Sequence, residues 1–244
     1  MQACLEPHDD GTHTLVARVD DWFHGFEVRL RCDGTEVIDA SATAHRHPWS
    51  SCPGALASVA RLRGPLAMVA AQLAHAPRST SCVHVTDLVW LAAQSHGLRN
   101  YQIELDPYEA TLTRDGEELL RWPLDEFKIA DDGPFHGLGP GLKGWSKQLA
   151  SVSADREFRE AVRVMRRGML VGVGYYTLEW SSYACGADVP HETMADSCYA
   201  FTSDRMATSD RVARVPIPRI RRTPEQRSRF SVDGSAGEPA DPPR

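Results

Sequence analysis

The sequence has no excess of positive charge and no long apolar run. It holds 27 Lys and Arg against 33 Asp and Glu, a formal net charge of -6, so it lacks the basic field that gathers nucleic-acid phosphates. No stretch approaches the roughly 20 apolar residues of a membrane span, and the acidic start MQACLEPHDDG has no positively charged leader. We therefore expect a cytoplasmic protein whose partner is a small molecule or a protein, with no nucleic acid and no membrane.

Cysteine is sparse, and phosphate-binding glycine motifs are missing. Six cysteines in 244 residues are too few for a disulfide scaffold, and a reducing compartment keeps them as thiols, so their positions bear on metals or reactivity. The glycine-rich stretch 137–141 contains a proline and no following Lys-Ser or Lys-Thr, so it is no phosphate loop. No dinucleotide, flavin or pyridoxal signature is visible, which disfavours an organic cofactor.

The first half of the chain moves from a strand pattern to a helix pattern. Apolar and polar residues alternate, as in half-buried strands, and Asp33-Gly34 is a hairpin turn. Apolar residues at helical spacing follow in three segments. The predicted strands are 14–21, 26–32 and 36–44, and the predicted helices are 53–62, 66–73 and a third that begins near 81 and ends at 97.

The second half also moves from strands to a helix. A hairpin turns on Asp115-Gly116, a glycine-rich loop follows, and a helix is predicted from Ser153. The apolar run 169–176 is either the end of that helix or a buried strand. We predict the α+β class, an antiparallel β-meander packed with helices, and leave open two related α+β halves. The expected units are 1–98, 99–214 and a tail, 215–244, which is disordered because Pro, Arg, Ser and Gly dominate it.

Cys82 and His84 stand in the stretch SCVHVTDL, where the third helical pattern begins. With Cys52 and His47 they lie at ends of predicted elements, so a compact unit could bring them together around zinc or iron. A helix start also favours a thiolate, which makes Cys82 a candidate nucleophile with His84 or His47 as its base. Simple burial of the thiol as a small apolar side chain is the competing interpretation.

Further candidates each have a structural alternative. Asp87, one turn beyond His84, could orient its ring or favour the helix start by its charge. Arg166 or Arg167 could pair with a substrate carboxylate or complement the end of a helix. Tyr175 could donate a proton or lie in the core.

Three motifs carry a family resemblance: Cys52-Pro53-Gly54-Ala55, the segment Cys82-Val83-His84-Val85-Thr86-Asp87-Leu88, and Cys198-Tyr199-Ala200-Phe201. They resemble a bacterial family known only as a domain of unknown function (DUF2889), with its C-P-x-A, C-T-H-L-x-[DE]-L and late Cys-Tyr-x-Phe elements. The resemblance runs from Leu15 to Arg214. Val83 stands where the family usually has Thr.

The first half is also similar to the U-type iron–sulfur cluster scaffold fold. In that family a histidine precedes the second cysteine, whereas here His84 follows Cys82, and Trp22-Phe23-His24 replaces the scaffold's Cys-Gly-Asp. The resemblance implies a fold and a site rather than the scaffold's function. The metal ligands that it implies are Cys52, Cys82, His84 and His24, which would hold a single zinc or iron ion if any metal is bound.

We expect a small-molecule enzyme, a lyase or hydrolase that acts by acid–base chemistry on an aromatic or apolar acid in a catabolic pathway. Arg166 or Arg167 would hold the substrate's charge, and aromatic residues would line its pocket. The alternative is a metal- or iron–sulfur-binding module without catalysis, and a homodimer stays open. The catalytic candidates are His84, His47, Asp87, Arg166 and Tyr175, and the expected pocket aromatics are Trp22, Phe23, Trp49 and Trp90.

Overall fold

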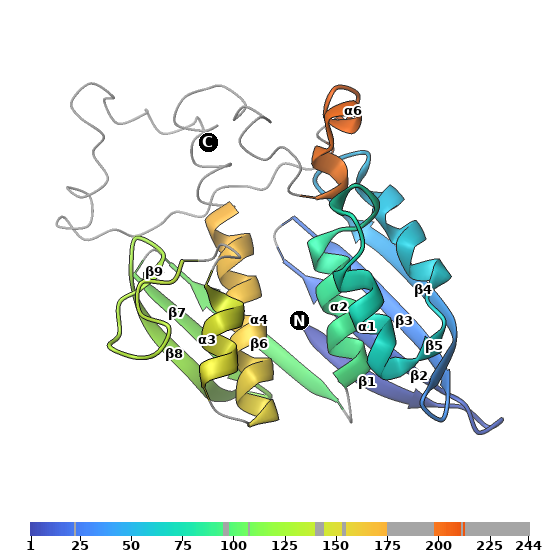
Figure 1. Ribbon diagram of the computed structural model, residues 1–244, viewed down its shortest axis with the longest axis horizontal. Coiled ribbons are helices and arrows are strands. Elements are labelled where there is room, and N and C mark those ends of the chain that lie inside the picture. The colour runs from blue at the N-terminus through green and yellow to red at the C-terminus, as the bar shows by residue number, and fades with distance from the viewer. Residues whose placement is uncertain are drawn as a thin grey trace, which may run out of the picture.

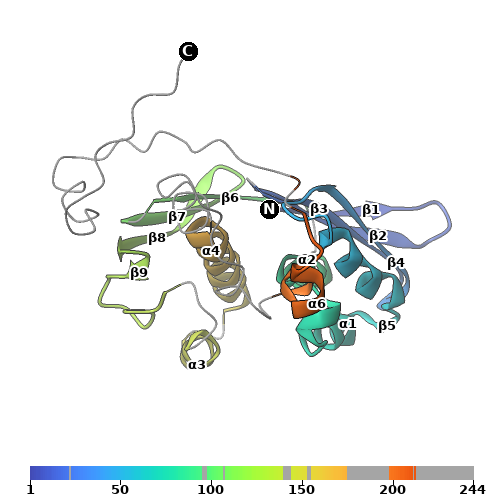
Figure 2. The same ribbon diagram turned by 90° about the horizontal axis from the view of Figure 1, so that it is seen from above.

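A computed structural model describes residues 1–21, 23–94, 98–106, 108–139, 144–152, 155–174, 198–210 and 212. In this part of the chain nine strands form one antiparallel sheet in the order β5-β4-β3-β2-β1-β6-β7-β8-β9. Seen from above, the helices lie on one side of that sheet (Figure 1, Figure 2). The predicted α+β class and antiparallel meander are confirmed.

The strands are β1 (Gln2–Pro7), β2 (His13–Asp20), β3 (Gly25–Asp33), β4 (Glu36–Arg46), β5 (Gly64–Pro65), β6 (Arg99–Leu105), β7 (Glu109–Arg114), β8 (Glu117–Asp125) and β9 (Lys128–Ile129). The α-helices are α1 (Leu66–Ala74), α2 (Val83–Gln94), α3 (Trp145–Ser151), α4 (Arg156–Gly174) and α6 (Ser203–Met206). Three 3₁₀ helices complete the described elements: η1 (Cys52–Arg61), η2 (Arg78–Thr80) and η5 (Tyr199–Phe201).

The meander of the first half has one apolar face and one charged face. Strands β2 and β3 pair over their whole length, from His13 opposite Cys32 to Asp20 opposite Gly25. Side chains such as Val28 and Leu30 point toward α2 and have no exposed surface. On the opposite face, part-exposed arginines of β2 and β3 pair with acidic residues, as Arg18 does with Glu27. This alternation is the pattern from which the strands are predicted.

Strand β1 joins the two halves of the sheet, and no strand is predicted there from sequence. It pairs with β2 along six residues and with β6 at Gln2 opposite Asn100 and Ala3 opposite Arg99. Its place depends on a partner almost 100 residues away in the chain. The local pattern of residues 2–7 carries no information about that pairing.

The second half packs α4 closely against β6. An ideal Cβ on Gly168 would lie 2.5 Å from Ile103 Cδ1, and one on Gly172 would lie 2.0 Å from Leu105 Cδ2. Two glycines one turn apart therefore let helix and strand approach. The apolar run that begins at Met169 continues α4 to Gly174; its last two residues lie outside the described part.

The described residues near the C-terminus return to the first half. The Tyr199 amide donates to the Ser81 carbonyl (3.1 Å), the Ser51 and Ser209 hydroxyls are 2.8 Å apart, and Val212 N–H donates to Pro48 O. The predicted tail, 215–244, lies outside the described residues. Within the described part, no helix is both long enough and apolar enough to cross a membrane.

Candidate functional site

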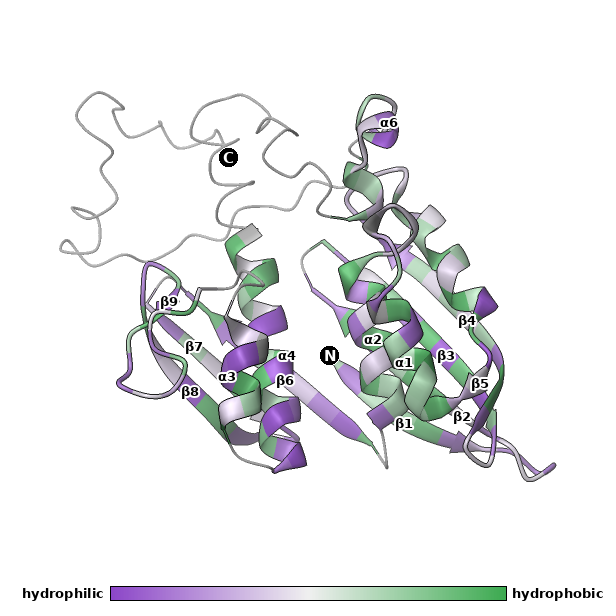
Figure 3. Cartoon of the chain, in the orientation of Figure 1, coloured by the Kyte–Doolittle hydropathy of each residue, from purple (hydrophilic) through white to green (hydrophobic). Residues whose placement is uncertain are grey.

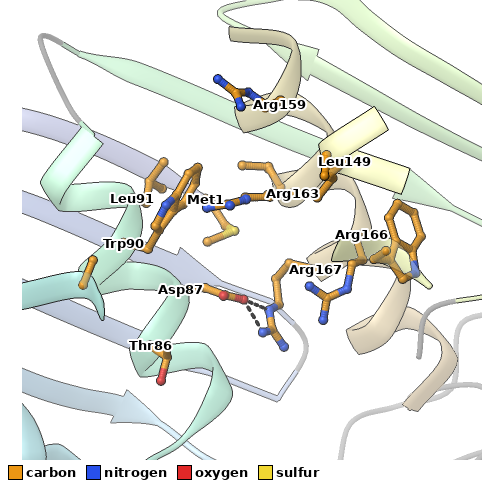
Figure 4. A pocket seen from close by; sticks show the side chains of 14 residues that line it. Met1, Thr86, Asp87, Trp90, Leu91, Leu149, Arg159, Arg163, Arg166 and Arg167 are labelled. Carbon is orange, nitrogen blue, oxygen red and sulfur yellow. Dashed lines mark hydrogen bonds and ion pairs between the residues drawn. The ribbon is translucent and has the colours of Figure 1, made fainter. Parts of the chain in front are cut away.

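Helix α4 presents four arginines to a pocket between the two halves of the molecule (Figure 4). Arg159, Arg163, Arg166 and Arg167 are spaced i, i+4, i+7 and i+8, which places them on one face of a helix. Hydrophilic bands alternate with apolar ones along α4 (Figure 3). We call this cavity, about 440 Å³ in volume, the arginine pocket.

The other walls of the arginine pocket are largely apolar. Helix α2 contributes Trp90 and Leu91, and α3 contributes Trp145 and Leu149. The Arg163 guanidinium lies 4.6 Å from the ring centroid of Trp90, in a cation–π contact. Apolar walls with a few convergent cations suit a small anion that has an apolar or aromatic body.

Two of the guanidinium groups in this pocket are incompletely paired. Among the described residues, Arg166 Nε and Arg167 Nη1 are buried and have no hydrogen-bond partner. Burial lowers the pKa of Arg166 below its ordinary value, and the charge of Arg167 lowers it further. Asp87 is the one carboxylate among the described lining residues. An anion that accepted these bonds would therefore remove an unfavourable burial of charge and of donors.

Asp87 pairs with Arg167 rather than with His84. Its carboxylate accepts hydrogen bonds from Arg167 (Figure 4). Arg167 Nη2 also donates to the Val83 carbonyl at 3.3 Å. Only 4% of the Arg167 side chain is exposed. The pair ties α2 to α4, so Asp87 orients a pocket arginine.

A second group of polar side chains, Asp21, His24 and His84, lies at the ends of β2 and β3 and on the first turn of α2. One potential ligand atom of each lies within 4.8 Å of the others. We call this group the Asp21 site. Asp21 Oδ1 accepts hydrogen bonds from the amides of Phe23 and His24, both 2.8 Å, and lies 3.1 Å from His24 Nδ1. The turn between two strands thus fixes the carboxylate.

His84 packs over His24, with the two ring centroids 3.8 Å apart and the planes at 28°. Burial lowers the pKa of His84 well below 6.5, and the charges of His24 and Arg167 add to this effect. Burial acts to raise the pKa of Asp21, but the hydrogen bonds and charge of His24, with His84, hold it at about 2. The Asp21 site therefore offers one carboxylate and one neutral imidazole at neutral pH.

Burial disfavours the thiolate forms of the two predicted cysteine ligands, Cys52 and Cys82. Burial raises the pKa of Cys82 to about 12 and that of Cys52 to about 12, and Cys198 lies close enough to raise both further. The start of α2 therefore does not make Cys82 a thiolate, because desolvation exceeds the favourable effect of the helix end. Cys82 Sγ lies 3.7 Å from His84 Nδ1 and contacts that ring directly. The five described cysteines are free thiols.

Other predicted residues lie apart from these two groups. His47, between β4 and η1, has a buried Nδ1 without a hydrogen-bond partner in the described part of the chain, and it is not a member of the Asp21 site. Trp49 packs against Phe201 at 5.6 Å between ring centroids. Tyr175 and Trp22 lie outside the described residues.

Three residues of these two groups, Arg159, Arg163 and Asp21, are not predicted as site residues from the sequence. Arg159 and Arg163 precede Arg166 on α4, and their helical spacing is a signal in the sequence that points to a shared face. Asp21 precedes His24 by three residues in the β2–β3 connection, and this spacing is typical of an Asx-type turn. No local signal places His84, some 60 residues later, beside them.

Comparison with known families identifies the first part of the chain. Residues 5–96 match the family described as Protein of unknown function (DUF2889). This match covers less than half of the chain, and it ends well before Arg214, to which the resemblance in the sequence extends. The matched segment contains the whole Asp21 site, Cys52 and Cys82, and ends before the arginines of α4.

The late motif of this family resemblance packs on the matched segment, residues 5–96. The Tyr199 ring lies so close to Gly54 that a Cβ there would be 2.3 Å from its hydroxyl, and Arg205 stacks 3.7 Å from the Tyr199 ring centroid. No curated protein and no solved structure matches the chain. The similarity to the iron–sulfur scaffold fold therefore stays a prediction.

Proposed function

We propose that this chain is an enzyme that binds an aromatic or otherwise apolar carboxylate in the arginine pocket and acts on it by acid–base chemistry of the lyase or hydrolase type. The observation that carries the proposal is the pair of buried guanidinium nitrogens, on Arg166 and Arg167, without a hydrogen-bond partner in the described part of the chain. A substrate carboxylate would accept bonds from both arginines. Trp90 would contact its apolar body.

The Asp21 site supplies the acid–base groups in this proposal. Arg167 lines the arginine pocket and also a second cavity of about 530 Å³, which Asp21 lines as well. A substrate anchored at Arg166 and extending past Arg167 would thus approach Asp21. His24, whose Nδ1 faces Asp21 Oδ1, is oriented by that carboxylate as a catalytic imidazole requires.

Carboxylate binding is tested first, by titration calorimetry with phenylacetate and with its uncharged analogue phenylacetamide. A charge-assisted hydrogen bond contributes about 1.5–3 kcal/mol, so Arg166→Gln should weaken phenylacetate binding roughly 10- to 150-fold. Arg163→Gln should also weaken it. The matched control is Arg121→Gln on β8, where a half-exposed arginine pairs only with surface glutamates among the described residues.

Two results would count against carboxylate binding. The first is equal affinity for phenylacetate and phenylacetamide, because the pocket would then not recognise charge. The second is an equal loss of affinity in Arg121→Gln and Arg166→Gln, because the effect would then be one of overall charge.

Catalysis is tested with 3-hydroxy-3-phenylpropionate, whose dehydration gives cinnamate and water and is followed by ultraviolet absorbance. In this reaction a base removes the proton next to the carboxylate, and the hydroxyl leaves as water after protonation. His24→Gln should abolish turnover and leave phenylacetate binding intact. Intact binding without turnover of this and related hydroxy acids would overturn the lyase assignment and leave a binding site.

The alternative function, a metal-binding module without catalysis, draws on different groups. It is favoured by the proximity of His24, His84 and Asp21. Its iron–sulfur version has weaker support, because a cluster requires cysteine ligands and the group of described side chains that lie close enough together contains none.

A further inference from the structure

The Asp21 site has two buried polar atoms that face each other without a hydrogen bond. Asp21 Oδ2 and His84 Nε2 are both buried and lack a hydrogen-bond partner among the described residues, and they stand 3.9 Å apart. An unsatisfied buried polar atom costs about 1–3 kcal/mol. Two of them directed at one another indicate a group that contacts both.

The other atoms of these side chains are already held in place. Asp21 Oδ1 accepts two backbone amides of the β2–β3 turn, which leaves Oδ2 directed toward α2. His84 Nδ1 contacts Cys82 Sγ. When Nδ1 carries the proton and donates toward that sulfur, Nε2 presents its lone pair to Asp21 Oδ2. Cys82 is then a positioning residue for His84.

We propose that Asp21, His24 and His84 bind one divalent first-row transition-metal ion, of the zinc or iron(II) class. Two imidazoles and one carboxylate form a three-ligand set that leaves coordination positions open, as in catalytic rather than structural sites. Nitrogen ligands disfavour magnesium and calcium, which take oxygen. Cys52 and Cys82, the thiols implied by the scaffold resemblance, are not ligands in this set.

The geometry needs only a small adjustment to admit the ion. Ligand atoms about 2.1 Å from a metal, at 90° to 109° from one another, stand roughly 3.0–3.4 Å apart. The separation of Asp21 Oδ2 and His84 Nε2 is 3.9 Å, and all three ligand atoms lie within 4.8 Å of one another. On binding, the ligand atoms would have to approach one another by rotation of these side chains.

Metal binding deepens the proposed function without depending on carboxylate binding, because it involves none of the pocket arginines. With an ion in place, a metal-bound water would replace the free imidazole of His24 as the proton acceptor. Because Asp21 also lines the second cavity, small molecules there would approach the ion. If the chain binds metal but not phenylacetate, only the proposed carboxylate binding in the arginine pocket is refuted. If it binds phenylacetate but no metal, only the proposed metal site is refuted.

The test uses the full chain, freed of metal with a chelator and dialysed. Zinc(II) and cobalt(II) are titrated separately by calorimetry, and cobalt(II) binding is also followed by absorbance. We expect one ion per chain, visible d–d bands, and no thiolate-to-cobalt charge-transfer band. His24→Gln should lower the affinity by more than the roughly 10- to 100-fold typical of an outer-shell change, and Asp21→Asn should do the same.

Two controls separate ligation from damage to the fold. His75→Gln removes an exposed histidine just after α1 and should leave the affinity unchanged. Cys82→Ser should retain the ion with at most the smaller, outer-shell loss. Circular dichroism identifies variants that do not fold. If Asp21→Asn is unfolded, the metal affinity of His24→Gln, just before β3, tests the proposal instead. The proposal is overturned if folded His24→Gln binds like the unmodified chain, or if a thiolate band appears and disappears in Cys82→Ser.

Discussion

Replacement of Asp87 by asparagine should destabilise the fold and strengthen anion binding at the same time. Arg167 is 4% exposed, and its described partners are the Asp87 carboxylate and the Val83 carbonyl. Asp87→Asn keeps the shape and one acceptor oxygen of the side chain but removes its charge. A buried guanidinium is then left without a counterion.

The magnitude follows from the burial of the pair. Breaking a fully buried ion pair costs about 3–5 kcal/mol, but Asp87 is 31% exposed and asparagine still accepts one bond. We therefore expect a loss of about 2 kcal/mol in the free energy of unfolding, which lowers the melting temperature by about 4–8 °C in a chain of this size. The matched control, Asp39→Asn, breaks an exposed pair with Arg63 and should cost less than about 1 kcal/mol.

The assay is urea unfolding with and without phenylacetate. In the Asp87→Asn chain a bound carboxylate replaces the missing charge beside Arg167, so phenylacetate should restore more stability than it adds to the unmodified chain. A loss below about 0.5 kcal/mol would show that the pair contributes little net stability. Equal stabilisation of both chains by phenylacetate would refute the placement of the ligand against Arg167.

Three further predictions concern pH, a buried carboxylate and close packing. The folded state holds the pKa of Asp21 at about 2, below its ordinary 3.8, so this group stabilises the fold above about pH 4 and loses the effect as pH falls toward 2. Its contribution, about 2 kcal/mol, should shrink by about 1 kcal/mol between pH 5 and pH 3. The measurement is the difference in unfolding free energy between the unmodified chain and Asp21→Asn, and a difference that does not change with pH would refute the depressed pKa. Glu160 is 2% exposed and accepts a hydrogen bond from Arg99 at 2.6 Å. Glu160→Gln should lower the free energy of unfolding in urea by about 2 kcal/mol, because Arg99 loses its counterion, and an unchanged free energy would contradict this account. Gly168→Ala should lower stability by about 1–2 kcal/mol in thermal unfolding despite its better helix propensity, because the new Cβ meets Ile103, and a stabilised variant would show that β6 moves away freely.

Much of the fold is predictable because its elements are specified locally. The alternation in β2 and β3, and the turns at Gly34 and at Asp115-Gly116, where the backbone adopts positive φ, are encoded in short stretches. Strand β1 is not fully specified in this way, because one of its two neighbours, β2, follows it directly but the other, β6, begins only at Arg99. The spacing over 53–62 indicates a helix, and the structure forms it as the 3₁₀ helix η1.

The candidate site also has a part that the sequence predicts and a part that it does not. Sequence alone indicates that Cys82, His84 and Arg166 are worth attention, and a helical projection of α4 would have added Arg159 and Arg163. From the sequence, a thiolate at the start of α2 and simple burial of Cys82 are both open, and burial raises the pKa of Cys82 to about 12. Burial is a property of the assembled core, so a local helix-end argument cannot foresee it.

The sequence by itself determined the α+β class, the two hairpin turns and the resemblance to a family of unknown function, which the family match supports over residues 5–96, because these depend on residues near one another in the chain. Only the tertiary structure decided that Asp87 pairs with Arg167, that His84 lies against His24 and Asp21, and that four arginines of α4 face α2. Each of these contacts joins segments far apart in sequence. Their energies come from desolvation and charge in a shared interior, which exists only once the sheet has brought its two halves together.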